Sequence, residues 1–178
     1  IREDQPTSLF SENDPLIRKL LELNHEYVDL CMVGNVLQWD QETYMPKGGD
    51  EARGNQLAMV AGFAHKVITD PKVGRLLADL QEQGERWSGT CFTDYDNALI
   101  RETRRAYDRR VKVPAKLVED ISRTTSQALE LWQKARKESD FRIFSGVLKS
   151  LLNLKLQEAH CVGFKDPPSN LFLDDHEP

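Results

Sequence analysis

Hydrophobic side chains recur between residues 16 and 37 at alternating spacings of four and three residues. This spacing places them on one face of a helix, as in the seam of a coiled coil. Asp14 before Pro15 is typical of a helix start, and Pro46 followed by Gly48 and Gly49 is typical of a turn. We therefore predict one long helix from residue 15 to that turn. Its seam consists of Leu16, Leu20, Leu23, Tyr27, Leu30, Gly34 and Leu37.

Start and stop signals predict five more helices along the rest of the chain. We expect them at about residues 50–68, 71–84, 93–112, 114–135 and 139–163, where Asp, Thr, Ser, Pro and Gly residues mark the ends. The expected inner positions of the first two are Leu57, Val60, Ala61, Ala64, Ile68, Val73, Leu76, Leu77 and Leu80. Those of the last three are Leu99, Ala106, Tyr107, Leu117, Ile121, Ala128, Leu131, Trp132, Ala135, Phe141, Phe144, Leu148, Leu151 and Leu152.

No stretch alternates with the period of two that a half-buried strand requires, so we expect no substantial sheet. Long helices with short connections favour antiparallel packing. The predicted fold is therefore all-α, an antiparallel bundle of about six helices. Three regions follow: a flexible N-terminal tail over residues 1–13, a helical region over residues 14–163, and an irregular acidic tail over residues 164–178.

The composition suits elongated amphipathic helices, because 39% of the 178 residues are hydrophobic and 30% are charged. A net charge of -5 excludes nucleic-acid binding through bulk charge. Basic residues do cluster between Arg101 and Lys112, but Glu102 and Asp108 interrupt them, which favours a solvated helix face. No apolar run is long enough to span a membrane, so we expect no membrane partner.

The three cysteines, Cys31, Cys91 and Cys161, lie far apart and form no metal-binding or disulfide pattern. Reduced thiols and an N-terminus without an apolar signal segment together predict a cytoplasmic protein.

Residues with metal-ligand or catalytic potential form no complete motif. His25 and Glu26 match the start of an HExxH zinc motif, but the position of the second histidine holds Asp29. His25 and Asp29 could still bind a metal weakly, although a surface histidine near a carboxylate is the plainer interpretation. The remaining histidines stand singly: His65, His160 and, in the acidic tail, His176. We therefore predict no catalytic, cofactor-binding or metal-binding residue in this chain.

The segment from Leu37 to Leu57 reads LQWDQETYMPKGGDEARGNQL, and further motifs follow it in order. This series resembles the N-terminal part of carboxypeptidase Taq-family metallopeptidases. The similarity covers nearly all of the chain after about residue 14. The later motifs contain Ala64, His65, Thr69, Asp70, Pro71; Arg101, Arg104, Arg105, Tyr107, Val113, Pro114; Trp132, Ala135, Arg136, Ser139, Asp140, Phe141, Phe144; and Gly163, Asp166, Pro167, Pro168, Leu171, Asp174, Glu177 and Pro178.

The resemblance implies a parent enzyme that is a helical, zincin-type carboxypeptidase. Such an enzyme has zinc at the base of a deep groove, removes C-terminal residues from peptides, and works as a homodimer. The family's zinc motif lies beyond the point where this chain ends, so the chain alone should bind no zinc and be inactive. Its expected partners are the catalytic remainder of the peptidase and, for the parent, peptide substrates and a second copy.

The resemblance also implies that these helices form a wall and lid of the groove. The candidate wall residues at the helix–helix corner are Trp39, Asp40, Glu42, Thr43, Met45 and Arg53. Each of them can instead be structural: Trp39 and Met45 would pack the corner, and Arg53 would pair with Asp40 or Glu42. An alternative function is a standalone interaction module whose seam pairs with another protein.

Overall fold

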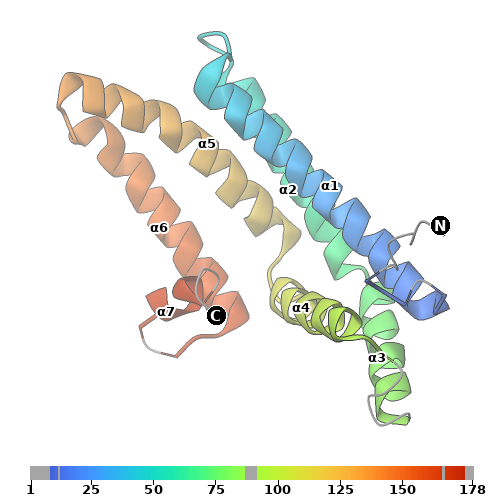
Figure 1. Cartoon of the computed structure of the whole chain (residues 1–178). Coiled ribbons are helices and arrows are strands. Elements are labelled where there is room, and N and C mark those ends of the chain that lie inside the picture. The colour runs from blue at the N-terminus through green and yellow to red at the C-terminus, as the bar shows by residue number, and fades with distance from the viewer. Residues whose placement is uncertain (1–8, 12, 87–91, 166, 175–178) are drawn as a thin grey trace. The chain divides into compact units, whose positions relative to one another are not determined.

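The computed structural model describes residues 9–11, 13–86, 92–165 and 167–174 (Figure 1). Over these residues the chain contains helices and no strand, which confirms the predicted all-α fold of six long helices. The helices are α1 (Pro15–Thr43), α2 (Asp50–Thr69), α3 (Pro71–Arg86), α4 (Asp94–Arg110), α5 (Ala115–Glu138), α6 (Arg142–Val162) and the short α7 (Ser169–Leu173).

The predicted tails fall only partly within the described residues. Residues 1–8, 12, 166 and 175–178 lie outside them, as do residues 87–91 between α3 and α4. Within the segment expected to be irregular, residues 169–173 form α7. None of the described helices is both long enough and apolar enough to cross a membrane.

The chain divides into two compact units, and both α1 and α2 contribute to each of them. The first unit comprises residues 1–28 and 67–111, and the second comprises residues 29–66 and 112–178. The predicted helical region 14–163 is therefore shared between the two units.

The first unit has a core of large aliphatic side chains. Ile17, Leu20, Val73, Leu77 and Leu80 are all fully buried. The side chains packed against this core are Phe10, Leu16, Leu21, Leu23, Leu76, Phe92, Leu99, Ile100 and Tyr107. Each fully buried aliphatic side chain of this size contributes about 1.5–3 kcal/mol to folding. The seam at the start of α1 and the apolar face of α3 thus form the core that the sequence predicts.

Asp14 begins α1 and also fixes the end of α3. Its Oδ1 accepts hydrogen bonds from the backbone amides of Leu16 and Ile17, at 2.8 and 3.2 Å, which satisfies two donors of the first turn. Its Oδ2 accepts a 2.6 Å hydrogen bond from the side-chain amide nitrogen of Gln83. One carboxylate therefore ties together residues 69 positions apart.

A fully buried carboxylate, that of Asp96, joins the segment before α1 to the start of α4. The Ser11 amide and hydroxyl donate to it at 3.1 and 2.7 Å. The Thr93 amide and hydroxyl donate to it at 2.8 Å each, and the Thr93 Oγ1 also caps the Asp96 amide. Burial raises the pKa of this carboxyl, but the hydrogen bonds from Ser11 and Thr93 outweigh that effect and hold the pKa below its usual value.

In the second unit, α5 and α6 form an antiparallel hairpin (Figure 1). Ser139 turns the chain with a left-handed φ of 52°, in the position where helix ends usually carry glycine. The Asp140 amide donates back to the carbonyl of Ala135 at 3.0 Å. The Asp140 carboxylate then caps α6 through the Arg142 amide and pairs with the Arg142 guanidinium. These local bonds form the turn between α5 and α6, at the boundary between helices that the sequence predicts.

Small residues bring α2 close to α5. A Cβ added to Gly62 would lie 2.7 Å from the Glu119 Oε1, and one added to Gly54 would lie 3.6 Å from the Ser126 hydroxyl. Ala58, one turn from each glycine, is 1% exposed. The Arg123 side chain donates to the Asn55 amide oxygen across the same contact at 3.0 Å.

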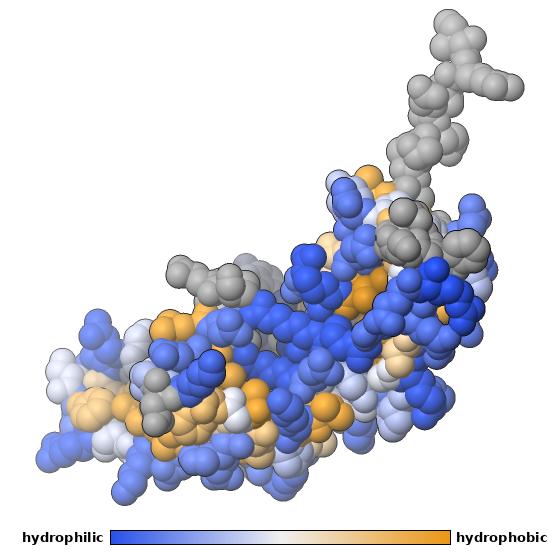
Figure 2. Space-filling model, turned by 90° about the horizontal axis from the view of Figure 1, so that it is seen from below, coloured by the Kyte–Doolittle hydropathy of each residue, from blue (hydrophilic) through white to orange (hydrophobic). Residues whose placement is uncertain are grey.

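The buried apolar residues of the second unit are mainly small as well: Ala58, Ala64, Val113, Leu117, Ala128, Ala135 and Ala159. Its larger side chains reach the surface. Trp132, Phe141 and Leu152 were predicted to face inward but are 48%, 64% and 56% exposed, so that prediction was wrong. Figure 2 shows such hydrophobic side chains at the surface, in patches between hydrophilic ones.

Replacing Asp96 with asparagine should destabilise the protein at neutral pH by about 1–3 kcal/mol, because an amide cannot accept from all four donors. The folded-state pKa lies below the ordinary value of 3.8, so this contribution is complete above that pH and is lost as the pH falls through the folded-state pKa. Urea unfolding should therefore separate wild type from D96N at pH 7, and the difference should disappear as the pH falls through the folded-state pKa of Asp96. Asp94→Asn, an exposed residue in the same helical turn, is the control. An equal loss in both variants would contradict the account.

Gly74 is expected to resist substitution. A Cβ there would lie 2.5 Å from the Tyr107 hydroxyl and 2.8 Å from its ring carbon, and a rigid ring cannot move aside without disturbing the core. Gly74→Ala should therefore cost about 1–3 kcal/mol despite the higher helix propensity of alanine. Gly146→Ala meets nothing within 4 Å in α6 and should stabilise its helix instead. Thermal unfolding followed by circular dichroism compares them, and a stabilised Gly74→Ala variant would refute the argument.

Candidate functional site

The corner between α1 and α2 lies in the second unit and contains all six candidate wall residues. The helix α1 ends when the amides of Tyr44 and Met45 both donate to the Asp40 carbonyl, at 3.0 and 2.9 Å. The Thr43 hydroxyl donates to the Trp39 carbonyl at 2.7 Å. Gly48 then takes a left-handed φ of 86°, which glycine adopts without strain and which turns the chain into α2.

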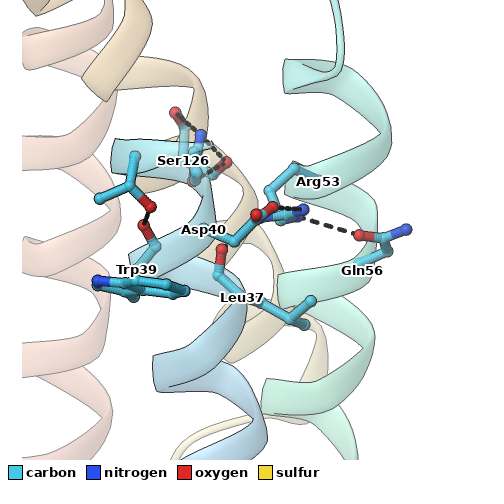
Figure 3. A network of polar contacts seen from close by, with 8 residues as sticks. Leu37, Trp39, Asp40, Arg53, Gln56 and Ser126 are labelled. Carbon is cyan, nitrogen blue, oxygen red and sulfur yellow. Dashed lines mark hydrogen bonds and ion pairs between the residues drawn. The ribbon is translucent and has the colours of Figure 1, made fainter. Parts of the chain in front are cut away.

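Arg53, in the first turn of α2, holds the corner together (Figure 3). Its Nη2 pairs with the Asp40 Oδ2 at 2.5 Å, and its Nη1 donates to the carbonyl of Leu37. Its Nε donates to the Gln56 Oε1 at 3.1 Å. The Arg53 side chain is 12% exposed, so all three nitrogens find partners where water has little access. Of the two carboxylates that the sequence offers to Arg53, the structure selects Asp40.

Gln41 joins α1 to α5 on another side of the corner. Its side-chain nitrogen donates to the Ser126 hydroxyl at 2.9 Å and to the Ser126 carbonyl at 3.2 Å. The Ser126 hydroxyl lies 3.1 Å from the Gln41 side-chain oxygen. Ser126 is 4% exposed, so the pair satisfies polar groups that would otherwise be buried without partners.

A cavity of about 350 Å³ opens between α1, α2, α5 and α6, next to the Gln41–Ser126 pair. Its polar lining residues are Gln38, Gln41, Glu42, Ser122, Thr125 and Ser126, and its apolar lining residues are Leu57, Ala128, Leu129, Trp132 and Phe144. The lining combines amides, hydroxyls and the Glu42 carboxylate with aliphatic and aromatic side chains, which suits a peptide side chain with an apolar part and a hydrogen-bond donor.

The six predicted residues do not form one continuous surface around this cavity. Glu42 lines it, whereas Asp40 and Arg53 are occupied with each other. Trp39, which we expected to pack the corner, is 57% exposed and contacts the exposed Tyr44 edge to face, with ring centroids 5.4 Å apart. In Figure 3 its indole points away from Arg53.

The other two candidates lie at the turn itself. Thr43 is exposed, and Met45 is half-buried with its side chain against Gly49. Sequence reasoning did not identify the lining residues Gln41 and Ser126. Uncharged polar residues 85 positions apart leave no pattern that would pair them.

The described residues do not fit a zinc site. No group of three or more histidine, cysteine, aspartate and glutamate side chains among them could hold a metal ion. His25 and Asp29 are both exposed on α1. Cys31 and Cys161 are free thiols, while Cys91 and the acidic cluster around His176 lie outside the described residues. We therefore derive no metal-dependent step from these side chains.

Replacing Arg53 with lysine should destabilise the corner by about 1–3 kcal/mol, because one ammonium cannot serve Asp40, Leu37 and Gln56 together. Arg142→Lys provides the matched control. Arg142 also pairs with an aspartate but is 90% exposed, so its replacement should have a much smaller effect on stability than that of Arg53. Urea denaturation at neutral pH measures both. Equal effects would show that the three bonds of Arg53 contribute no more than an exposed ion pair.

Comparison with known proteins identifies the family. The model of the carboxypeptidase Taq (M32) metallopeptidases matches residues 19–178. Thermostable carboxypeptidase 1 of Thermus thermophilus is 31% identical over 175 residues, which cover 90% of this chain and 33% of that protein. Thermostable carboxypeptidase 1 of Pyrococcus furiosus is 25% identical over 147 residues, which cover 80% of this chain and 28% of that protein.

Solved structures agree with this assignment. The M32 carboxypeptidase of Deinococcus radiodurans superposes with a TM-score of 0.67 at 26% identity, over 91% of this chain and 31% of that chain. The crystal structure of BsuCP shares the fold with a TM-score of 0.83 at 19% identity, over 90% of this chain and 31% of that chain. The chain spans about a third of the length of the curated relatives it matches. The resemblance inferred from the motifs is thus confirmed, and the chain belongs to the carboxypeptidase Taq (M32) family of metallopeptidases.

Proposed function

We propose that this chain is the N-terminal helical region of a metal-dependent carboxypeptidase that removes C-terminal residues from peptides. The observation that carries the proposal is the family match over residues 19–178, set beside relatives about three times as long. By the same resemblance, the metal and the chemistry belong to the part of the enzyme that has no counterpart here. In the family that metal is zinc, which supplies an activated water molecule.

The part played by these helices is to shape access to the groove. Two sets of bonds hold the corner in place: Arg53 links α2 to the last turns of α1, and Gln41 links α1 to α5. A wall of the groove needs such a fixed corner. Glu42 and the cavity beside it present polar groups near that corner, where they can contact a peptide. By the same resemblance the parent is a cytoplasmic homodimer.

The alternative, a standalone module that pairs through the α1 seam, has less support. Within the first unit the seam residues Leu16, Leu20 and Leu23 already pack in the core. In the second unit Leu30 and Leu37 are half-buried. Seam side chains that already pack within their own units leave little apolar surface for another protein to bind.

A chimera tests the proposal directly. The matched third of the Thermus thermophilus relative is replaced by residues 19–178 of this chain. Supplied with metal, the purified chimera should release C-terminal residues from peptides, because the wall of the groove is restored. The relative with that third deleted is the control and should be inactive. A chimera that folds cooperatively but hydrolyses no peptide would refute the proposed function.

The isolated chain gives a second prediction. It should bind no stoichiometric zinc and release no C-terminal residue, because the described residues lack a ligand set. Elemental analysis after dialysis measures the metal, and amino-acid release from peptides measures the activity. One tightly bound zinc ion per chain would place the metal site here and overturn this part of the proposal.

A further inference from the structure

The helix α6 is rich in large apolar side chains, yet the structure buries none of them completely. Ala159 is its only fully buried residue. An apolar helix face normally packs against another part of a protein, because exposed apolar area costs free energy. The large apolar residues of α6 are Ile143, Phe144, Val147, Leu148, Leu151, Leu152, Leu154, Leu156 and Val162, and all of them are half-buried or exposed.

The first unit shows that this exposure is not general to the chain. That unit buries Ile17, Leu20 and Leu77 completely and has only four exposed large hydrophobic residues among those described. The second unit has twelve. The first unit therefore buries its large apolar side chains in its own core. The second unit leaves large apolar side chains exposed, as surfaces that bind another part of a protein do.

Four large apolar residues, at the start of α6 and along it, lie in a row. Phe141, Leu148, Leu152 and Leu156 follow at spacings of seven, four and four residues, which places them on one side of the helix. Phe141, Leu152 and Leu156 are 64%, 56% and 44% exposed, and Leu148 is half-buried. We name these four residues the α6 face.

A groove of about 400 Å³ lies at the Phe141 end of the α6 face. It is formed where α5 and α6 meet at their turn, and Trp132, Phe141 and Phe144 supply its aromatic side chains. An aromatic groove beside an aliphatic row suits an amphipathic helix that inserts one large apolar side chain as an anchor.

The comparisons indicate what covers this face. Chains that share this fold are about three times as long, since the matched region is 31% of each solved chain and 33% of the Thermus thermophilus relative. We infer that the α6 face and its groove bind an apolar helical surface of the catalytic part of the same carboxypeptidase. This inference rests on the proposed function and names the surface through which the wall joins the rest of the enzyme.

The test substitutes Leu152 and Leu156 together with glutamine, in the isolated chain and in the chimera. Both side chains are exposed in the isolated chain, so the substitutions should leave its helicity and melting temperature unchanged. In the chimera the same pair should lower the melting temperature by several degrees and reduce peptide hydrolysis, because the glutamines would be buried against an apolar partner. Val111→Gln, an exposed apolar residue of the first unit, is the control and should be silent in both.

The outcomes separate this inference from the proposed function. An active chimera that tolerates both glutamines would overturn the α6 face as a docking surface and leave the proposed function intact. An inactive but folded unsubstituted chimera would refute the proposed function instead.

Sedimentation of the isolated chain decides independently between the catalytic part and a second copy. A monomer at micromolar concentration supports docking to the catalytic part. A stable dimer that Leu152→Gln and Leu156→Gln dissociate would identify a second copy as the occupant and overturn the inference.

Discussion

The second unit depends on the close approach of α2 to α5. Gly54, Ala58 and Gly62 follow at intervals of four residues on α2, and side chains of α5 lie across the two glycines. Hydrogen bonds between side chains then hold the helices around this contact in place. Gln41 brings the end of α1 to Ser126 on α5, and Arg123 of α5 reaches Asn55 on α2. A side chain much larger than alanine on this stripe of α2 would clash with α5 and disturb these bonds.

Close packing through small residues has a consequence for the large ones. When glycine and alanine occupy the inner side of α2, its large side chains Met59 and Phe63 remain 54% and 47% exposed. The contact therefore fixes how α2 and α5 pack but buries little apolar area. Because the burial of apolar area is the main source of folding free energy, this contact contributes little to it. Arg53 compensates in part, because a guanidinium with three partners fixes the corner without a large apolar core.

The sequence predicts the helices well because their ends carry residues with a local mechanism. Asp14 caps α1, Thr93 forms a capping box with Asp96, and Gly163 ends α6, and each of these signals acts within a few residues. The corner was partly predictable for the same reason, since Arg53 needs a carboxylate and two lie nearby in the chain. Ser139 shows a limit of this reasoning. It adopts a left-handed φ, which at a helix end is usually found for glycine and not for serine.

What the sequence could not predict are the non-local relations. The apolar period of α6 identifies Phe141 and Leu152 as hydrophobic positions, but a period does not say whether anything lies against them. The Gln41–Ser126 pair and the cavity beside it depend on how α1 meets α5, which no local signal encodes. Only the family-level motifs carried information over such distances, and they indicated an enzyme larger than these helices.

The contrast between the units bears on how such an enzyme is built. A unit with an aliphatic core, such as the first, holds its shape through its own contacts. A unit held by small residues and polar bonds, such as the second, leaves large apolar side chains exposed at the end of α5 and along α6. In the docking proposed above, the catalytic part covers this apolar surface and adds to the stability of the unit. The corner and the cavity lie in the same unit, so such docking would stabilise the α6 face and the proposed wall together.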